Sequence, residues 1–426
     1  MKRARDSFKN FVTALKVGWF LAIRQLKRSS YATTGLIIFV MMLTFLNLVV
    51  VRGVLVGLIQ GSEEVYKTAY AGDIIISVLP KKSYIEDSPT VIEQIKNLPW
   101  IKSYSARYII GGKVEAGYKE RVRVTDAPNS AGGSITGINP INEENTTGVA
   151  SKIIEGRFLT SSDTDSIVLG ADLLKKYVPV ESPGFSLLEN VEVGDKVRIT
   201  VNGNIKEMTI IGIIRSKAGE VDSRVFMLDT TLRSFIGRTD YNVDEIAIAL
   251  KPGVDSIMVK NTLKAGRAGE VARVQTAEEA LPKFLLDIKA TFALLGNVVG
   301  SIGLVVASIT IFIVIFVNAI TRRKFIGILK GIGINAVAIE FAYVLQSVFY
   351  ASIGIAAGLA VLYGVLVPYV DANPIKFPFS DGILVAELGS TLFRAGMLMI
   401  ATLIAGYIPA RIVVKQNTLD AILGRK

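Results

Sequence analysis

The chain has 426 residues, of which 50% are hydrophobic and 20% are charged, and it carries a formal net charge of +11. This composition is too apolar for an ordinary soluble protein and too charged for a bundle of membrane spans alone, so it predicts a mixed architecture. The absence of cysteine and histidine excludes disulfides, thiol nucleophiles, thiolate or imidazole metal sites and histidine-centred acid–base catalysis.

Residues 7–28 predict an amphipathic helix that lies on the inner leaflet of the membrane, within an N-terminal segment of residues 1–30. One stripe of this helix is apolar and consists of Phe8, Phe11, Val12, Leu15, Trp19, Ala22 and Leu26. Two interpretations stay open: a lever that contacts a cytoplasmic partner, and a passive interfacial anchor, which is favoured.

Four apolar stretches are long enough to cross a bilayer, which takes about 20 residues of helix. They cover roughly residues 33–57, 291–319, 338–367 and 391–409. The first is too long and too far from the N-terminus for a cleaved secretory signal, so we expect a retained anchor. The sequence therefore predicts an α-helical membrane protein with four transmembrane helices and a large domain between the first two.

Basic residues beside the spans predict the orientation, because positive charge near span ends stays in the cytoplasm. The segment before the first span contains Lys2, Arg3, Arg5, Lys9, Lys16, Arg24, Lys27 and Arg28 against one acid, Asp6. The inner loop contains Arg322, Arg323, Lys324 and Lys330, and the tail contains Arg411, Lys415, Arg425 and Lys426. We therefore predict a multi-pass protein of the cytoplasmic (inner) membrane with both termini in the cytoplasm. This pattern also explains the net charge better than nucleic-acid binding does.

The spans divide the chain into consecutive parts. These are a cytoplasmic helix (1–30), the first span (31–58), an extracytoplasmic domain (59–275), a stalk and the second span (276–319), a cytoplasmic loop (320–337), the third span (338–367), an external loop (368–390), the fourth span (391–409) and a cytoplasmic tail (410–426). No Asp, Glu, His or Lys lies near the middle of a span, which argues against an ion-coupled carrier. Arg52 and Arg394 fall near outer span ends, where snorkelling to the headgroups is favoured over a role in a substrate path.

The external domain has the local patterns of an α+β fold. Ser88-Pro89 predicts the start of a helix that ends before Pro99. Residues 73–78 predict a strand. Asn202-Gly203, with alternating apolar residues on either side, predicts a tight hairpin.

Three further patterns concern the organisation of this domain. Small polar residues at 126–150 predict a loop that separates two subdomains, at about 60–125 and 150–275. Thr276 and Glu279 form a capping box, which predicts a helix that starts outside the membrane and continues into the second span, with a kink at Pro282. The carboxylates of 143–165 and 219–245 are spread through polar turns, so we expect a solvated surface instead of acid–base chemistry.

The loop between the second and third spans is the candidate functional site. Over residues 321–333 it reads T-R-R-K-F-I-G-I-L-K-G-I-G. No segment of the chain has the G-x-x-x-x-G-K-[ST] pattern of an ATP-binding loop, and the glycines of this loop follow no strand. The residues themselves predict a short basic amphipathic helix tied to two spans, which suits transmission of a push.

This loop resembles that of the FtsX/MacB-type permeases of ABC transporters, also called type VII, which typically reads like T-R-R-x-E-I-G-I-L-K-A-x-G-A. The resemblance implies that the segment docks on an ATPase subunit. The residues to which it assigns this coupling role are Arg322, Arg323, Lys324, Ile326, Gly327, Ile328, Leu329, Lys330 and Gly333. The chain departs from the family pattern at Phe325, where the family usually has Glu.

Further stretches support the resemblance. Residues 155–159, 167–170, 193–197 and 210–213 look like signatures of the family's MacB-like extracytoplasmic core, and their glycines are typical of turns and bulges. The tail, at 408–411 and 418–423, resembles the family's closing P-A-R…A-L segment. The resemblance therefore covers nearly the whole chain in the expected order.

The resemblance implies the permease subunit of an ABC transporter, driven by an ATPase in a separate chain that binds the ATP. This chain would then hold no cofactor and no metal, and it would not be an enzyme. A permease dimer is implied, either of two copies or with a similar permease, and the need for an adaptor outside the membrane stays open. The expected function is export or extraction of a lipophilic, lipoprotein or peptidic substrate. The alternatives are FtsX-like signalling to an external cell-wall hydrolase without transport, and a membrane receptor or scaffold without ATPase coupling.

Overall fold

The computed structural model describes residues 2–28, 30–119, 128–178, 186–373, 375–377, 380–382 and 384–415. The chain forms two compact units. The first, called the membrane unit, consists of Met1–Leu58, Ile288–Lys376 and Gly382–Lys426, and the second, called the inserted domain, consists of Ile59–Asp287 and Phe377–Asp381. Each unit has a hydrophobic core of its own.

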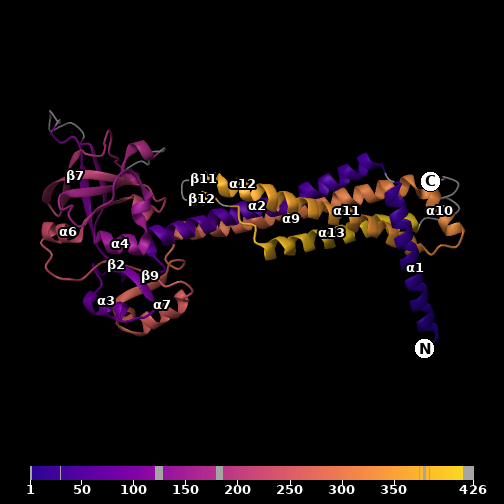
Figure 1. The fold of residues 1–426 in the computed structure, drawn as a ribbon, viewed down its shortest axis with the longest axis horizontal. Helices are drawn as coiled ribbons and strands as arrows, with labels where there is room; N and C mark the ends of the chain where they lie inside the picture. Colours follow the sequence, from indigo (N-terminus) through magenta and orange to yellow (C-terminus); the bar gives the residue numbers. More distant parts are fainter. Residues whose placement is uncertain are drawn as a thin grey trace. The chain divides into compact units, whose positions relative to one another are not determined.

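Long apolar helices make up most of the membrane unit, and Figure 1 shows them running alongside one another. They are α2 (Tyr31–Tyr66), α9 (Lys283–Thr321), α11 (Ala336–Val361) and α13 (Leu388–Val414). The π-helix η5 (Leu362–Leu366) and α12 (Val367–Ala372) extend α11, and α1 (Lys2–Lys27) and α10 (Arg323–Gly331) belong to the same unit. Among the described residues, four helical segments are long and apolar enough to cross a membrane. Each contains one predicted span, so the four-span prediction is confirmed.

The long helices share one core, to which each contributes buried side chains. Met41 and Phe45 of α2 are fully buried, as are Tyr343 and Tyr350 of α11. Helices α2 and α11 approach closely at Gly354, where a Cβ would lie 2.5 Å from the Cβ of Met41. Small residues are the usual means of close helix packing in a membrane, where lipid tails are as apolar as the side chains.

The inserted domain is built on a sheet to which ten strands of the described chain contribute. The strands are β1 (Ile74–Val78), β2 (Ile101–Glu115), β3 (Ser130–Ile138), β4 (Ile153–Gly156), β5 (Ser166–Gly170), β6 (Lys196–Val201), β7 (Asn204–Ile214), β8 (Arg224–Leu228), β9 (Glu245–Leu250) and β10 (Ala272–Thr276). Their order is β10-β1-β9-β2-β3-β8-β5-β7-β4, and β6 pairs with β2 and β7.

Helices and short turns connect these strands. They are η1 (Lys67–Ala71), α3 (Ser88–Lys96), α4 (Pro140–Thr147), η2 (Val149–Lys152), η3 (Ala171–Leu173), η4 (Lys175–Tyr177), α5 (Gly219–Asp222), α6 (Asp229–Ile236), α7 (Ser256–Ala265) and α8 (Arg267–Val271). A separate pair of short strands is formed by β11 (Ile375–Phe377) and β12 (Ser380–Gly382). The predicted α+β domain between the first two membrane helices is therefore confirmed.

Three local sequence signals correspond to the predicted elements. Helix α3 has Pro89 in its first turn and ends before Pro99, and the strand predicted at 73–78 is β1. Strands β6 and β7 pair antiparallel across Asn202-Gly203. Both turn residues have positive φ, 49° and 83°, as a two-residue hairpin turn requires.

The prediction of a loop at 126–150 is wrong for the part of this segment that the structure describes, because β3 and α4 occupy it. Residues 126 and 127 lie outside the described residues. The long strand β2 pairs with β9 through its first half and with β3 through its second half. The small residues of this segment do not form a linker. They allow close packing of β3, since a Cβ at Gly137 would lie 3.0 Å from the Cα of Asp229. The sheet therefore runs across the boundary predicted between 60–125 and 150–275.

The capping box forms, but it does not start a membrane helix. The N–H of Thr276 donates to Oε2 of Glu279 (3.2 Å), and the N–H of Glu279 donates to Oγ1 of Thr276 (3.3 Å). Residues 277–280 then form a turn, and α9 begins at Lys283. Pro282 precedes this helix and does not kink it, because proline has no N–H to donate and is tolerated at a helix start.

Replacing Gly212 with alanine is expected to destabilise the inserted domain. Gly212 lies in β7, and a Cβ there would collide with the backbone carbonyl oxygen of Arg157. Overpacking of this kind typically costs about 1–3 kcal/mol. Thermal unfolding of the full-length protein in detergent measures the effect. Gly132→Ala in β3 is the matched control, because nothing lies within 4 Å of a Cβ at that position. Equal melting temperatures for the two variants would contradict the prediction.

Candidate functional site

The predicted coupling loop folds as the short helix α10, which joins α9 to α11. Helix α9 ends at Thr321, and Arg322 has a non-helical backbone (φ −102°, ψ 11°) that separates the two helices. Gly333 has a φ of +90°, which favours glycine, and it ends the segment. Asn335 then caps α11 by accepting a hydrogen bond from the N–H of Val337 (3.0 Å). Each end of α10 is thus set by an identifiable break in the helix.

One face of α10 packs into the membrane unit. Ile326 and Gly327 are buried, and Leu329 packs against the core that the long helices share. Lys330 Nζ donates a hydrogen bond to the carbonyl oxygen of Val414 (2.9 Å), in the last turn of α13. A cation at this position also suits the negative end of the α13 dipole. This inner face fixes α10 to the ends of other membrane helices.

The opposite face of α10 carries an apolar stripe that the described residues leave exposed. Phe325, Ile328 and Ile332 are 68%, 42% and 71% exposed. Their spacing of three and four residues places them on one side of the segment, and Lys324 is exposed beside them. An exposed apolar stripe bordered by charge is typical of a protein contact surface. We call it the outer face of α10.

The structure divides the predicted coupling residues between these two faces. Lys324 and Ile328 belong to the outer face, whereas Arg322 and Arg323 are half-buried at the start of the helix. Sequence reasoning missed Phe325 and Ile332 as contact residues, and it treated Phe325 only as a departure from a pattern. Phe325, Ile328 and Ile332 are spaced by three and four residues, which is the period of one helix face. This signal in the sequence indicates Phe325 and Ile332 as members of the same surface as Ile328.

Helix α1 packs on α11 through small residues. Ala14, Gly18 and Ala22 are buried, and a Cβ at Gly18 would lie 2.7 Å from the carbonyl oxygen of Ala338. Of the predicted apolar stripe, Ala22 is buried against the protein, whereas Trp19 is exposed together with Phe20. The side chains of Phe8 and Phe11 lie outside the described residues. The face of α1 that packs on α11 is therefore the one with small residues, because large side chains would prevent the close approach of the two backbones.

Arg52, which we expected to snorkel, has a partner on another helix. Its Nη1 donates to Oδ1 of Asn297 on α9 (3.2 Å), and both side chains are exposed. The bond ties α2 to α9.

The prediction that the carboxylates of 143–165 and 219–245 are solvated is wrong for Glu143, Asp222 and Asp244, which are buried in the inserted domain. Glu143 and Arg107 are each 1% exposed. The guanidinium of Arg107 donates twice to this carboxylate, from Nε (2.9 Å) and Nη2 (2.6 Å). Ser105 and Thr147 hydroxyls also donate to it, at 2.7 and 3.0 Å. A charge removed from water needs such partners, and here every carboxylate oxygen has one.

A second buried ion pair adjoins the first. Arg224 donates to both oxygens of Glu245, at 3.0 Å each, and Nη1 of Arg107 lies 3.4 Å from Oε2 of Glu245. Tyr70 donates from its hydroxyl to Oε1 of Glu245 (2.7 Å). We call Tyr70, Arg107, Glu143, Arg224 and Glu245 the charged cluster.

Electrostatics keep the charged cluster ionised. Burial opposes ionisation of Glu245, but the Arg224 and Arg107 guanidiniums outweigh it and lower its pKa to about 2. Arg107 likewise outweighs burial and lowers the pKa of Glu143. Burial raises the pKa of Tyr70, so its hydroxyl stays a hydrogen-bond donor. Two cations and two carboxylates therefore balance in a largely buried site.

The pKa of Asp244 is raised, whereas those of Glu143 and Glu245 are lowered. This carboxyl group should therefore make stability depend on pH. Its Oδ2 accepts from the N–H of Ile109 (2.7 Å), yet burial raises its pKa from 3.8 to about 6. The folded state therefore holds a proton that the unfolded state has released, and the contribution of Asp244 to stability is lost as the pH rises from about 4 to 6. The expected loss is on the order of 2 kcal/mol, at about 1.4 kcal/mol per pKa unit with allowance for partial solvation.

The variant Asp244→Asn removes this titration while it keeps an oxygen that can accept the Ile109 bond. The measurement is the free energy of unfolding of the full-length protein by denaturant at pH 4.5 and at pH 7. From pH 4.5 to pH 7 the wild type should lose more of this free energy than the variant does. Parallel pH profiles would contradict the assignment.

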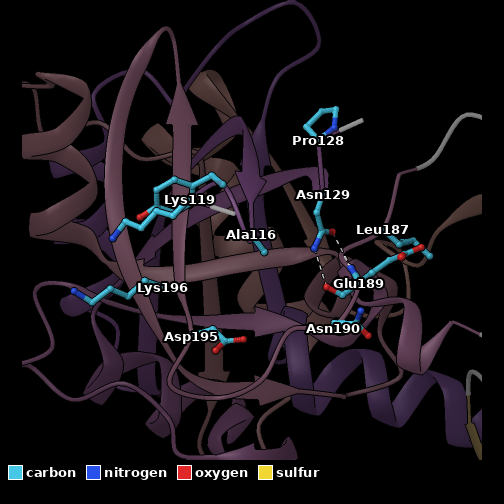
Figure 2. Close-up of a pocket in the computed structure, with 11 residues that line it drawn as sticks. Ala116, Lys119, Pro128, Asn129, Leu187, Glu189, Asn190, Asp195 and Lys196 are labelled. Carbon is cyan, nitrogen blue, oxygen red and sulfur yellow. Dashed lines mark hydrogen bonds between the residues drawn. The ribbon is translucent and has the colours of Figure 1, made fainter. Parts of the chain in front are cut away.

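A polar hollow of about 660 Å³ opens beside the ends of β2, β3 and β6. Figure 2 shows the amide of Asn129 bonded to the backbone of Glu189: Nδ2 donates to the Glu189 carbonyl (2.7 Å), and the Glu189 N–H donates to Oδ1 (2.8 Å). Lys119 and Lys196 both pair with Glu207, at 3.0 and 3.2 Å. Among the lining residues that the structure describes, the polar groups named here are occupied with one another, which suits a surface depression better than a reactive site.

Two family models match the chain. The model of the MacB-like periplasmic core domain matches residues 34–265, and the model of the FtsX-like permease C-terminal region matches residues 297–418. Together they cover most of the inserted domain, most of the long helices, and α10.

Two curated relatives and one solved structure are similar to parts of the chain. An uncharacterized ABC transporter permease of Methanocaldococcus jannaschii is 26% identical over 279 residues, which are 64% of this chain and 65% of the relative. The ABC transporter permease YtrF of Bacillus subtilis is 24% identical over 230 residues, 51% of this chain and 52% of the relative. The chain thus spans less than two thirds of the length of both relatives. The periplasmic region of MacB from Actinobacillus actinomycetemcomitans is 15% identical, with a TM-score of 0.33, and the match covers 48% of this chain and 88% of that one.

Proposed function

Because the chain belongs to the FtsX/MacB-type permeases of ABC transporters, we propose that it transmits the ATP-driven motion of a separate ATPase chain to its inserted domain. By this motion it exports or extracts a lipophilic, lipoprotein or peptidic substrate. ABC permeases are membrane transport proteins and not a class of enzymes, and the family implies an ATPase partner and a dimer.

The observation that carries the proposal is the outer face of α10. It presents Phe325, Ile328 and Ile332 on a helix whose other face is packed into the membrane unit. A partner bound there would push on the ends of membrane helices directly, because Lys330 connects α10 to the end of α13. Interfaces are energetically dominated by such buried anchors in a polar surround.

The orientation and the assembly are part of the same proposal. The basic residues at α1, at Arg322–Lys324 and at the end of α13 support cytoplasmic termini in a cytoplasmic membrane, with α10 inside and the inserted domain outside. ATP would be bound by the ATPase chain, and this chain would need no cofactor. Two permease subunits, identical or similar, would form the dimer.

Co-expression of the full-length chain with an ABC ATPase encoded beside it tests the proposal. The ATPase should copurify with the chain, and after reconstitution into vesicles ATP should drive release of a bound substrate from the inserted domain. Activation of an external hydrolase without any cargo would favour signalling, the second hypothesis. Failure of every such ATPase to bind would overturn both and leave a receptor or scaffold.

A further inference from the structure

The first membrane helix is joined to the sheet by an unusual turn. Helix α2 ends at Tyr66, and the chain continues as the π-helix η1, closed by a hydrogen bond from the N–H of Gly72 to the carbonyl of Lys67 (2.9 Å). Gly72 has a φ of +67°, and a Cβ there would lie 2.5 Å from the carbonyl oxygen of Ile248. π-helices are rare and occur frequently at functional sites. The backbone thus leaves little freedom where α2 meets β1.

Two guanidiniums lie against the ring of Tyr70, which is part of this π-helix. Cζ of Arg107 and Cζ of Arg224 lie 5.1 and 5.0 Å from the ring centroid. Its carbonyl oxygen accepts from Nη2 of Arg107 (2.7 Å), and its hydroxyl donates to Glu245 (2.7 Å). These three partners lie on β2, β8 and β9, which stand on both sides of the sheet's middle strand. One side chain is therefore fixed to both halves of the domain.

The segment that leads into the second membrane helix meets the first at the same place. Strand β1 pairs with β10, with Ile74 opposite Thr276. The hydroxyl of Tyr66 donates to the carbonyl oxygen of Ala280 (2.8 Å), in the turn before α9. The rings of Tyr66 and Tyr70 are in edge contact, with centroids 5.1 Å apart.

Stability alone is a poor explanation for the charged cluster. Replacing a buried ion pair by apolar residues of similar volume is often neutral or stabilising, because desolvation offsets much of the attraction. Charged, hydrogen-bonded partners do fix one geometry, since each donor has a single matching acceptor. A fixed geometry at the end of α2 is what transmission of movement would need.

We propose that Tyr70, clamped by Arg107, Arg224 and Glu245, positions the inserted domain on α2, so that movement of this helix reaches both halves of the sheet. The inference rests on the proposed function. It assigns these side chains the role of positioning residues.

Spin labels on the full-length complex with its ATPase, in vesicles, can test this without removing native thiols, because the chain has no cysteine. Glu64→Cys labels an exposed site on α2, before the π-helix η1, and Ser161→Cys labels an exposed turn of the inserted domain between β4 and β5. The distance from each label to the equivalent label on the second permease subunit is measured with and without ATP. In the wild type both distances should shift.

The paired variant Arg224→Met with Glu245→Leu should keep the shift at Glu64→Cys and lose it at Ser161→Cys, with an unchanged melting temperature. Tyr70→Phe removes the hydroxyl that donates to Glu245 and accepts from Arg224 (3.4 Å), and it should reduce the Ser161→Cys shift. This variant provides the test if the paired variant is unstable. The control is Lys82→Met with Glu86→Leu, a surface ion pair of the same domain (2.6 Å), which should behave as wild type. A full shift at Ser161→Cys in both cluster variants would overturn the inference, whereas no ATP-driven shift in the wild type at either site would overturn the proposed function.

Discussion

Replacing Arg107 with alanine is expected to destabilise the inserted domain of the full-length protein strongly, while the protein still inserts into membranes. The substitution would leave the Glu143 carboxylate, 1% exposed, without its bidentate partner. It would also leave the carbonyl of Tyr70 without its donor. Removing one partner of a buried ion pair typically costs about 3–5 kcal/mol. That cost is a large part of the stability of a typical domain, about 5–15 kcal/mol.

Fluorescence of Trp100 gives the measurement, because this residue packs against the core of the inserted domain and the chain's other tryptophan, Trp19, lies in α1. In detergent, the Trp100 transition of Arg107→Ala should move to a much lower denaturant concentration. The paired variant Arg107→Met with Glu143→Leu should lose far less, because no charge is left unpaired. An Arg107→Ala protein as stable as this paired variant would show that the Glu143 charge is not the cause.

The contrast between the spans and the charged cluster shows what the sequence could predict. A span is a property of about 20 consecutive residues, so hydropathy finds it without knowledge of its neighbours. The hairpin at Asn202-Gly203 is equally local, because a positive φ at two residues sets the turn. These elements were predicted correctly for that reason.

Glu143 is the opposite case. Its sequence neighbours are polar, and its burial depends on Arg107, which is 36 residues away in the chain. Asn139-Pro140 carries the cap and first-turn signals of a helix and could have located α4. No local pattern, however, indicates which face of α4 meets a buried arginine. The same holds for Lys330 on α10, whose partner at Val414 is 84 residues away.

The outer face of α10 should be necessary for ATPase binding. Phe325→Asp and Ile328→Asp would each place a carboxylate on the exposed apolar stripe, which an apolar partner surface could not accept without burying an unpaired charge. Loss of an interface anchor typically costs about 2 kcal/mol or more, roughly a thirty-fold weaker complex. Copurification and binding titration with the ATPase measure it. Ile205→Asp, at an isoleucine of the inserted domain that is 60% exposed, is the matched control and should bind normally.

The inner face of α10 should act after binding. Ile326→Ala would leave a cavity between α10 and the membrane unit, and Lys330→Met would remove the bond to Val414. We expect both variants to bind the ATPase as the wild type does, because the outer face is intact. The ATP-driven shift of a spin label at Ser161→Cys should nevertheless be lost, since a loosened α10 absorbs the push instead of passing it to α13. If inner-face variants lost ATPase binding and outer-face variants kept it, the assignment of the two faces would be reversed, and the partner would contact the membrane helices by another route.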